Sequence, residues 1–179
     1  DLHRFSRRQR QMCIRDRRMK KLFLITMILF TACSKHDIDL KIINAEDLFS
    51  QVRIHQDSDV VLINFWATTC GPCIEEFPMI VDLSNQYREK NLAVYFVSAD
   101  WEDMTKEVIS FLSSQGVSGI SFLKEEGNDN DFINAIDENW SGAIPFTLVY
   151  DKKGNVVSAW EGKKDKEFFE NEIISALNL

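Results

Sequence analysis

The sequence is poor in proline and glycine, with 3 and 7 of these residues among 179. Collagen-like and low-complexity chains contain far more of both, and a hydrophobic content of 45% is too high for a disordered tail. The chain also has no internal repeat and no long linker. Its length fits one domain with a targeting segment. We therefore expect a single folded core.

Basic residues are scarce in most of the chain. Residues 1–33 hold 9 Lys and Arg against 2 Asp and Glu, which leaves 12 against 26, or a net charge of −14, for the remainder. Nucleic-acid backbones are anionic and are bound by basic surfaces. We therefore expect no nucleic-acid partner.

An apolar run at residues 22–32 is only eleven residues long, whereas a membrane-spanning helix needs about 20. It follows Met19, Lys20 and Lys21, and a short basic region before such a run is typical of a secretory signal. The sequence therefore predicts export, which places the domain outside the cytoplasm.

The end of this run, Phe30-Thr31-Ala32-Cys33, resembles a bacterial lipoprotein signal, although Phe30 stands where leucine is usual. The resemblance implies lipid attachment at Cys33 and a membrane-anchored protein on the periplasmic side, with the outer membrane as the expected site. A plain cleaved signal or an uncleaved anchor is the alternative.

The residues before Met19 do not fit a signal sequence. Residues 4–18 are basic without apolar periodicity, and residues 11–17 resemble translated sequencing-adapter read-through. We therefore predict a non-native leader at 1–18, which includes Cys13, a signal at 19–33, a short tether at 34–37 and one domain at 38–179.

Within the domain, strand and helix patterns alternate. Short runs rich in apolar, β-branched and aromatic residues predict strands at 40–43, 60–66, 92–98, 120–123, 146–150 and 156–160. Apolar residues at helical spacing predict helices at 46–55, 70–89, 103–115, 131–139 and 165–177. Such an alternation, ending in a hairpin and a helix, favours an α/β fold in which helices flank a central mixed sheet.

Two cysteines remain after Cys13 and Cys33 are set aside, and both lie in Cys70-Gly71-Pro72-Cys73, between a predicted strand and a predicted helix. The unpaired amides and dipole at a helix N-terminus favour the thiolate form of a cysteine. Cys73 is three residues further on and lies within reach of Cys70. One sulfur can therefore attack a disulfide while the other resolves the mixed disulfide.

Two other interpretations of this pair are open. Zinc needs three or four ligands, but the domain offers only this pair and the distant His36 and His55, so we expect no metal. A purely structural disulfide is possible in an exported protein, although it closes almost no loop and adds little stability.

The segment from Asn64 to Pro78 resembles the thioredoxin superfamily and, within it, the TlpA/ResA-like extracytoplasmic thiol-disulfide oxidoreductases. The similarity covers about residues 38–179 and includes Asn64, Glu76 with Phe77-Pro78, and Ile144-Pro145 as a cis-proline strand start. An extra strand and helix between 118 and 139 match the insertion of this branch. Thr69 departs from the usual tryptophan, which leaves substrate preference open.

The resemblance implies a thioredoxin fold and a role for each matched residue. Cys70 is the expected nucleophile, Cys73 the resolving thiol and Pro145 the residue that shapes the substrate cleft. Glu76 either takes the proton of Cys73 or raises the thiol pKa values by its charge, or it is an ordinary solvated carboxylate. The expected cleft residues are Trp66, Thr69, Gly71, Pro72 and Ile144. The redox-active disulfide is the expected centre, with no other cofactor.

The Gly71-Pro72 pair resembles superfamily reductants. A reductant in an oxidising compartment implies protein thiol or disulfide substrates, with apocytochrome c as a candidate, and a membrane electron donor of the DsbD or CcdA kind. One alternative is a peroxide-reducing redoxin, although no arginine accompanies the cysteines in that pattern. Another is a non-enzymatic copper-binding module, although no histidine follows His55.

Overall fold

The computed structural model describes residues 37–178. The predicted leader, the signal, Cys33 and residues 34–36 of the tether lie outside the described residues. In the part of the chain that is described, no helix has the length and apolar character needed to cross a membrane.

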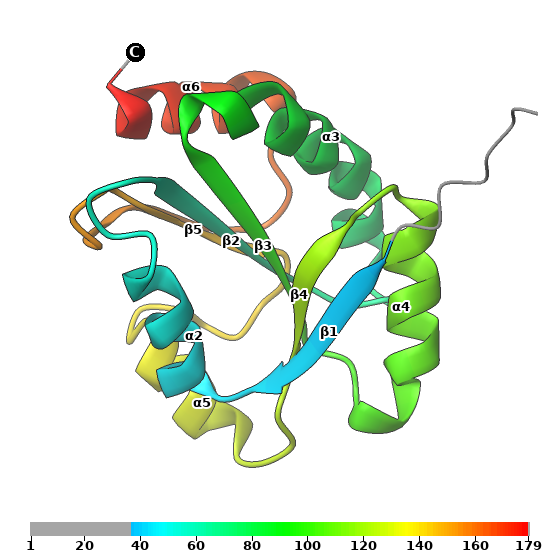
Figure 1. Cartoon of the computed structure of the whole chain (residues 1–179). Coiled ribbons are helices and arrows are strands. Elements are labelled where there is room, and N and C mark those ends of the chain that lie inside the picture. Colours follow the sequence, from blue (N-terminus) through cyan, green and yellow to red (C-terminus); the bar gives the residue numbers. More distant parts are fainter. Residues whose placement is uncertain (1–36, 179) are drawn as a thin grey trace, which may run out of the picture. The chain divides into compact units, whose positions relative to one another are not determined.

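Six strands form one sheet (Figure 1): β1 (Ile38–Ile43), β2 (Val60–Trp66), β3 (Leu92–Ser98), β4 (Gly119–Lys124), β5 (Phe146–Tyr150) and β6 (Val156–Glu161). Their order across the sheet is β1-β4-β3-β2-β5-β6. The first four strands pair in parallel, while β5 is antiparallel to both β2 and β6. The predicted mixed sheet and C-terminal hairpin are confirmed.

Helices cover both faces of this sheet (Figure 1). They are α2 (Ala45–Arg53), α3 (Gly71–Tyr87), α4 (Thr105–Ser114), α5 (Asp129–Ile136) and α6 (Lys166–Leu177). Helices α3, α4 and α6 pack on one face, and α2 and α5 pack on the other. The helix predicted at 103–115 is divided, because a short 3-10 turn at Glu102–Met104 precedes α4.

Strand β2 is buried along its whole length, as its continuous apolar sequence predicts. Since successive side chains of a strand point to opposite faces, Leu62 and Trp66 join the core under α3, α4 and α6. Ile63 and Phe65 join the core under α2 and α5. Asn64 is the polar exception and is 1% exposed.

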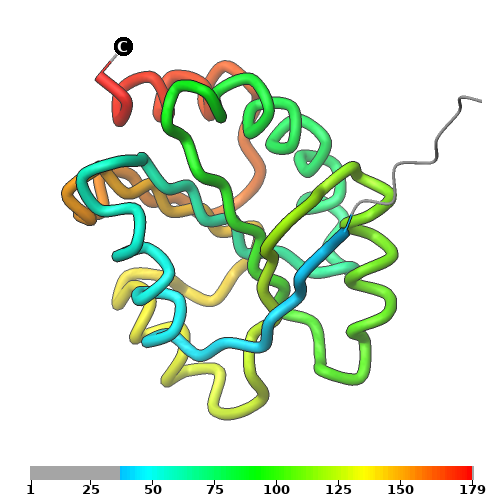
Figure 2. The backbone as a smooth tube through the Cα atoms, viewed as in Figure 1, coloured from blue at the N-terminus to red at the C-terminus, as the bar shows by residue number. Residues whose placement is uncertain are grey.

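The strand of the predicted insertion, β4, lies inside the sheet, and its helix is α5. Strand β4 pairs with β1 on one side and with β3 on the other. After β4 the chain forms α5 beside α2 and then returns to the start of β5 (Figure 2). The segment between β4 and β5 therefore ends at the sheet edge where β2 leads into α3.

Candidate active site

The Cys70–Cys73 motif lies where β2 passes into α3. Cys70 is the N-cap of α3, and Pro72 is in its first turn, where a missing amide hydrogen leaves no helical bond unmade. Gly71 and Pro72 are exposed. No acidic residue lies in this first turn. No carboxylate there therefore offsets the positive potential of the helix N-terminus, which favours a Cys70 thiolate.

The two cysteines form a disulfide with an S–S distance of 2.04 Å. The Cys70 sulfur also accepts a hydrogen bond from the Cys73 amide, with the nitrogen 3.3 Å away. Cys70 is half-buried, whereas Cys73 is 1% exposed. An incoming sulfur can therefore approach Cys70 but not Cys73, and the same amide can stabilise a Cys70 thiolate.

The loop before β5 faces this disulfide. The Cys70 sulfur lies 3.7 Å from the carbonyl oxygen of Ile144, and the Ile144–Pro145 peptide bond is cis, as the resemblance implies. Ser141 donates to the Glu161 carboxylate through both its amide and its hydroxyl group. The loop beside the disulfide is thus tied to β6.

Glu76 is buried, with an exposed fraction of 2%, so the alternative of a solvated carboxylate is wrong. Its Oε1 accepts from Asn64 Nδ2 at 3.2 Å, and its Oε2 accepts from the Lys164 amide at 3.2 Å. Burial raises the pKa of Glu76 from 4.5 to about 7, while the Lys164 amide, Asn64 and the charge of Lys163 each lower it. Such a carboxyl group can take up or release a proton near neutral pH.

The sequence did not assign the partners of Glu76. Asn64 also donates to Thr147 Oγ1 at 3.0 Å, and these two residues are paired neighbours on β2 and β5. Asn64 stood out as the single polar residue of an apolar strand, and that is the signal that could have marked it as a site residue. The amide of Lys164 lies 88 residues from Glu76 and left no sequence signal.

Asp100 is a second residue that the sequence analysis missed. Its carboxylate accepts from the Thr68 amide at 2.9 Å, from the Thr68 hydroxyl at 2.7 Å and from the Ser98 hydroxyl at 2.7 Å. Thr68 belongs to the loop that leads to Cys70. Because β2 and β3 are parallel, the polar residues after both strands meet at one edge of the sheet.

Trp66 does not line a cleft, and that prediction is wrong. It is fully buried and packs against Phe77 and Phe111, with ring centroids 4.9 Å and 4.8 Å away. The reason is strand alternation, which points residue 66 into the core between the sheet and α3. Thr69, in contrast, is exposed beside Cys70.

The chain is similar in sequence to known proteins. The profile of the Redoxin family matches residues 39–176. A thiol-disulfide oxidoreductase ResA from Bacillus thuringiensis is 30% identical over 117 residues, covering 62% of this chain and 59% of the relative. The thioredoxin-like protein YneN from Bacillus subtilis is 30% identical over 115 residues, covering 63% of this chain and 62% of that protein. The alignments thus span about three fifths of these relatives.

Solved structures show the same fold. A thioredoxin family thiol:disulfide interchange protein from Chlorobium tepidum superposes with a TM-score of 0.60 at 22% identity, over 70% of this chain and 83% of that one. A DsbE-type chain from the same organism gives a TM-score of 0.55 at 26% identity, over 68% and 82% of the two chains. With its helix-capping disulfide and facing cis-proline loop, the chain belongs to the Redoxin family and to the TlpA/ResA-like members of the thioredoxin superfamily.

Proposed function

We propose that this protein is a thiol-disulfide oxidoreductase that reduces disulfides of other proteins through Cys70 and Cys73. The observation that carries this proposal is the unequal burial of a disulfide at a helix N-terminus, with Cys70 half-buried and Cys73 enclosed. This arrangement separates an attacking sulfur from a resolving one, which disulfide exchange through a mixed intermediate requires.

In the first step the reduced protein meets a substrate disulfide. The Cys70 thiolate attacks one substrate sulfur, the substrate S–S bond breaks, and the other substrate sulfur leaves as a thiolate with the electron pair. The Cys73 amide stabilises the attacking thiolate, since it already points at the Cys70 sulfur. The Ile144 carbonyl group lies beside that sulfur, where it can accept a hydrogen bond from an extended substrate segment.

In the second step Cys73 resolves the mixed disulfide. Its thiol loses a proton and attacks the Cys70 sulfur, the bond between Cys70 and the attached substrate sulfur breaks, and that substrate sulfur leaves as a thiolate. Glu76 follows Cys73 by three residues, hence on the same side of α3. With a pKa of about 7, its carboxylate is a suitable acceptor for the Cys73 proton.

The direction of the reaction and its cellular setting complete the proposal. The Gly71-Pro72 pair supports a reducing potential nearer to about −270 mV, as in thioredoxin, than to about −120 mV, as in DsbA.

The predicted signal supports an extracytoplasmic protein held by a lipid on Cys33. There it would receive electrons from a membrane donor of the DsbD or CcdA kind, and apocytochrome c is a candidate substrate. Metabolic labelling with palmitate should be lost in Cys33→Ser.

Insulin disulfide reduction tests the activity. The wild type should precipitate insulin in the presence of a dithiol reductant, and Cys70→Ser should abolish its contribution. Cys73→Ser should instead accumulate a mixed disulfide with the substrate through Cys70. If Cys70→Ser keeps the wild-type rate, the proposal is wrong.

Two rival activities have their own outcomes. Faster turnover of hydrogen peroxide than of insulin would favour a peroxide-reducing redoxin. Tight binding of Cu(I) by the reduced protein, with no insulin reduction, would favour a metal-binding module.

A further inference from the structure

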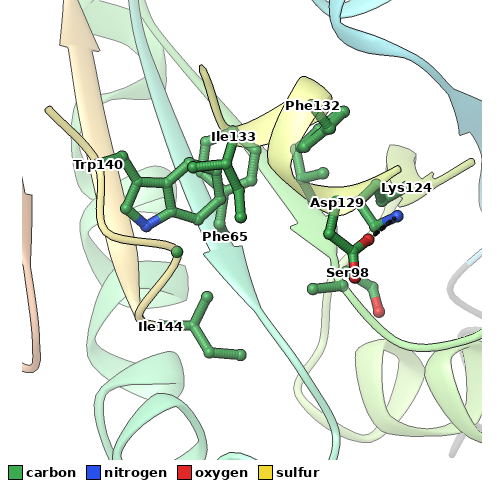
Figure 3. Close-up of a pocket in the computed structure, with 11 residues that line it drawn as sticks. Phe65, Ser98, Lys124, Asp129, Phe132, Ile133, Trp140 and Ile144 are labelled. Atoms are coloured by element: carbon green, nitrogen blue, oxygen red, sulfur yellow. Dashed lines mark ion pairs between the residues drawn. The ribbon is translucent and has the colours of Figure 1, made fainter. Parts of the chain in front are cut away.

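A small cavity reaches the loop that faces the disulfide, on the face of the sheet covered by α2 and α5. Its volume is about 140 Å³, and its apolar walls include Phe65 from β2, Phe132 and Ile133 from α5, and Trp140 and Ile144 from the loop before β5 (Figure 3). Helix α5 of the insertion therefore contributes one wall, and the cis-proline loop contributes another.

Ile144 connects this cavity to the reacting sulfur. Its side chain lines the cavity, and its carbonyl oxygen is 3.7 Å from the Cys70 sulfur. A substrate sulfur must reach Cys70 for exchange to occur. An extended segment rises about 3.3 Å per residue, so a side chain within about two residues of the substrate cysteine can reach the cavity.

The polar groups around the cavity already have partners. Lys124 Nζ is 2.8 Å from Asp129 Oδ1 at the cavity wall (Figure 3). Ser98 donates its hydroxyl hydrogen to Asp100, and the indole N–H of Trp140 is also satisfied within its own loop. A polar guest would lose its hydrogen bonds to water and would have to compete with these existing contacts, so the apolar walls favour an apolar guest.

The size of the cavity points to one side chain. An apolar cavity of about 150 Å³ is known to bind benzene, so about 140 Å³ suits a single aromatic or large aliphatic group. The surrounding rings make the walls rigid, since Trp140 stacks on Phe146 with centroids 4.6 Å apart and also packs against Phe65 at 4.9 Å.

We infer that this cavity is a specificity subsite, which receives a phenylalanine or similarly large apolar side chain located within two residues of the substrate's reactive cysteine. This inference rests on the proposed function and adds the class of substrate. The preferred substrate is thus a polypeptide in which the cysteine has a bulky apolar neighbour.

Peptides with a single cysteine joined to 5-thio-2-nitrobenzoate test this subsite. Reduced Cys70 attacks the peptide sulfur and displaces the coloured 5-thio-2-nitrobenzoate anion, and Cys73 then releases the peptide thiol as the protein disulfide forms. The peptides are made in pairs that differ at one position only, where one peptide has phenylalanine and the other has serine. The varied positions run from two residues before the cysteine to two residues after it. For at least one position the phenylalanine peptide should react about tenfold faster.

Two variants locate the effect. Ile133→Trp narrows the cavity and should bring the ratio of phenylalanine to serine rates close to one. Ile54→Trp is the matched control. Ile54 is 69% exposed and precedes β2, whereas Cys70 follows β2, so the two residues lie towards opposite ends of this strand. The control should retain the wild-type ratio. A ratio of rates cancels any general change in the reactivity of the dithiol.

The outcomes separate the two proposals. No release of the coloured anion by the wild type contradicts the proposed function. Release at equal rates, within twofold at every position, contradicts the subsite alone, and this comparison needs no variant. An unchanged ratio in a folded Ile133→Trp protein also overturns the subsite. If that variant does not fold, Ile133→Ala should shift the preference from phenylalanine towards tryptophan, and an unshifted preference contradicts the assignment.

Discussion

Asn64 donates a hydrogen bond from Nδ2 to Glu76 Oε1 over 3.2 Å, which joins the middle of the central strand β2 to α3. The same amide group donates to Thr147, so both of its hydrogens are used. This bond and the Lys164 amide hold the Glu76 carboxyl group in an enclosed place, yet burial dominates and keeps its pKa at about 7. The helix that carries the two cysteines therefore also carries a group that titrates at neutral pH.

The first prediction concerns stability and pH. The folded-state pKa of Glu76, about 7, exceeds the reference value of 4.5, so the folded protein binds this proton more tightly than the unfolded chain does. The contribution of Glu76 to the free energy of unfolding is therefore complete below pH 4.5 and is lost as pH rises through 7. Between pH 5 and 8 this loss amounts to about 2–3 kcal/mol.

Urea unfolding of the oxidised protein at several pH values measures this loss. Glu76→Gln cannot ionise and should lack that part of the decline. Glu75→Gln is the matched control, since Glu75 is exposed and pairs with Lys163. A Glu75→Gln protein should keep the decline, and a Glu76→Gln protein with the same slope as the wild type would contradict the assignment.

The second prediction separates two neighbouring lysines. The positive charge of Lys163 lowers the pKa of Glu76, whereas Lys164 acts through its backbone amide and places its ammonium group 5.3 Å from the Phe168 ring centroid. Lys163→Gln should raise the Glu76 pKa by a few tenths of a unit, since one exposed charge is worth about 0.2–1 kcal/mol. Lys164→Gln should change it less. NMR titration of the carboxyl carbon measures both, and equal shifts would contradict the distinction.

The third prediction concerns the core under α3. Phe77 is fully buried and stacks on Phe96 with ring centroids 4.1 Å apart. Phe77→Ala should lower the free energy of unfolding by about 3–5 kcal/mol, because it removes a whole buried ring. Ile74→Ala, on the same helix but 37% exposed, is the control and should cost less than about 1 kcal/mol. Urea unfolding compares the two, and similar losses would contradict this packing.

The sequence predicts elements whose signals are local. The strand at 60–66 has the bounds of β2, because a continuous apolar run with polar flanks is local information. The helix predicted at 70–89 ends earlier, at Tyr87, and continues as a 3-10 turn at Arg88–Lys90, because helix ends depend on weak terminal hydrogen bonds.

Features that depend on contacts between distant segments could not be predicted from local sequence patterns. The enclosure of Glu76 requires a backbone amide 88 residues away, and no residue type in the sequence indicates such a contact. The cavity beside Ile144 is likewise formed by residues from five separate segments: β2, the end of β3, the end of β4, α5 and the loop before β5. Sequence patterns therefore located the two cysteines that form the disulfide, but not these contacts between distant segments.

The last prediction concerns Asp100, which holds the loop before Cys70. Thr68 gives its amide and hydroxyl hydrogens to this carboxylate, and Ala67 in the same loop accepts from the Cys70 amide at 3.1 Å. Asp100→Ala leaves the Thr68 amide without this acceptor and should lower the free energy of unfolding by about 2–4 kcal/mol. It should also slow the reaction of Cys70 with a small disulfide, because the attacking sulfur is positioned less well.

Thr68→Val is the matched control for Asp100→Ala, since it removes only the hydroxyl bond and leaves the amide bond in place. Its loss of stability should be about 1 kcal/mol, and its rate of exchange should stay close to that of the wild type. Urea unfolding and stopped-flow kinetics with a small disulfide measure the two effects separately. Reduced stability with an unchanged rate in Asp100→Ala would show that Asp100 supports the fold without positioning Cys70, and this result would contradict the prediction.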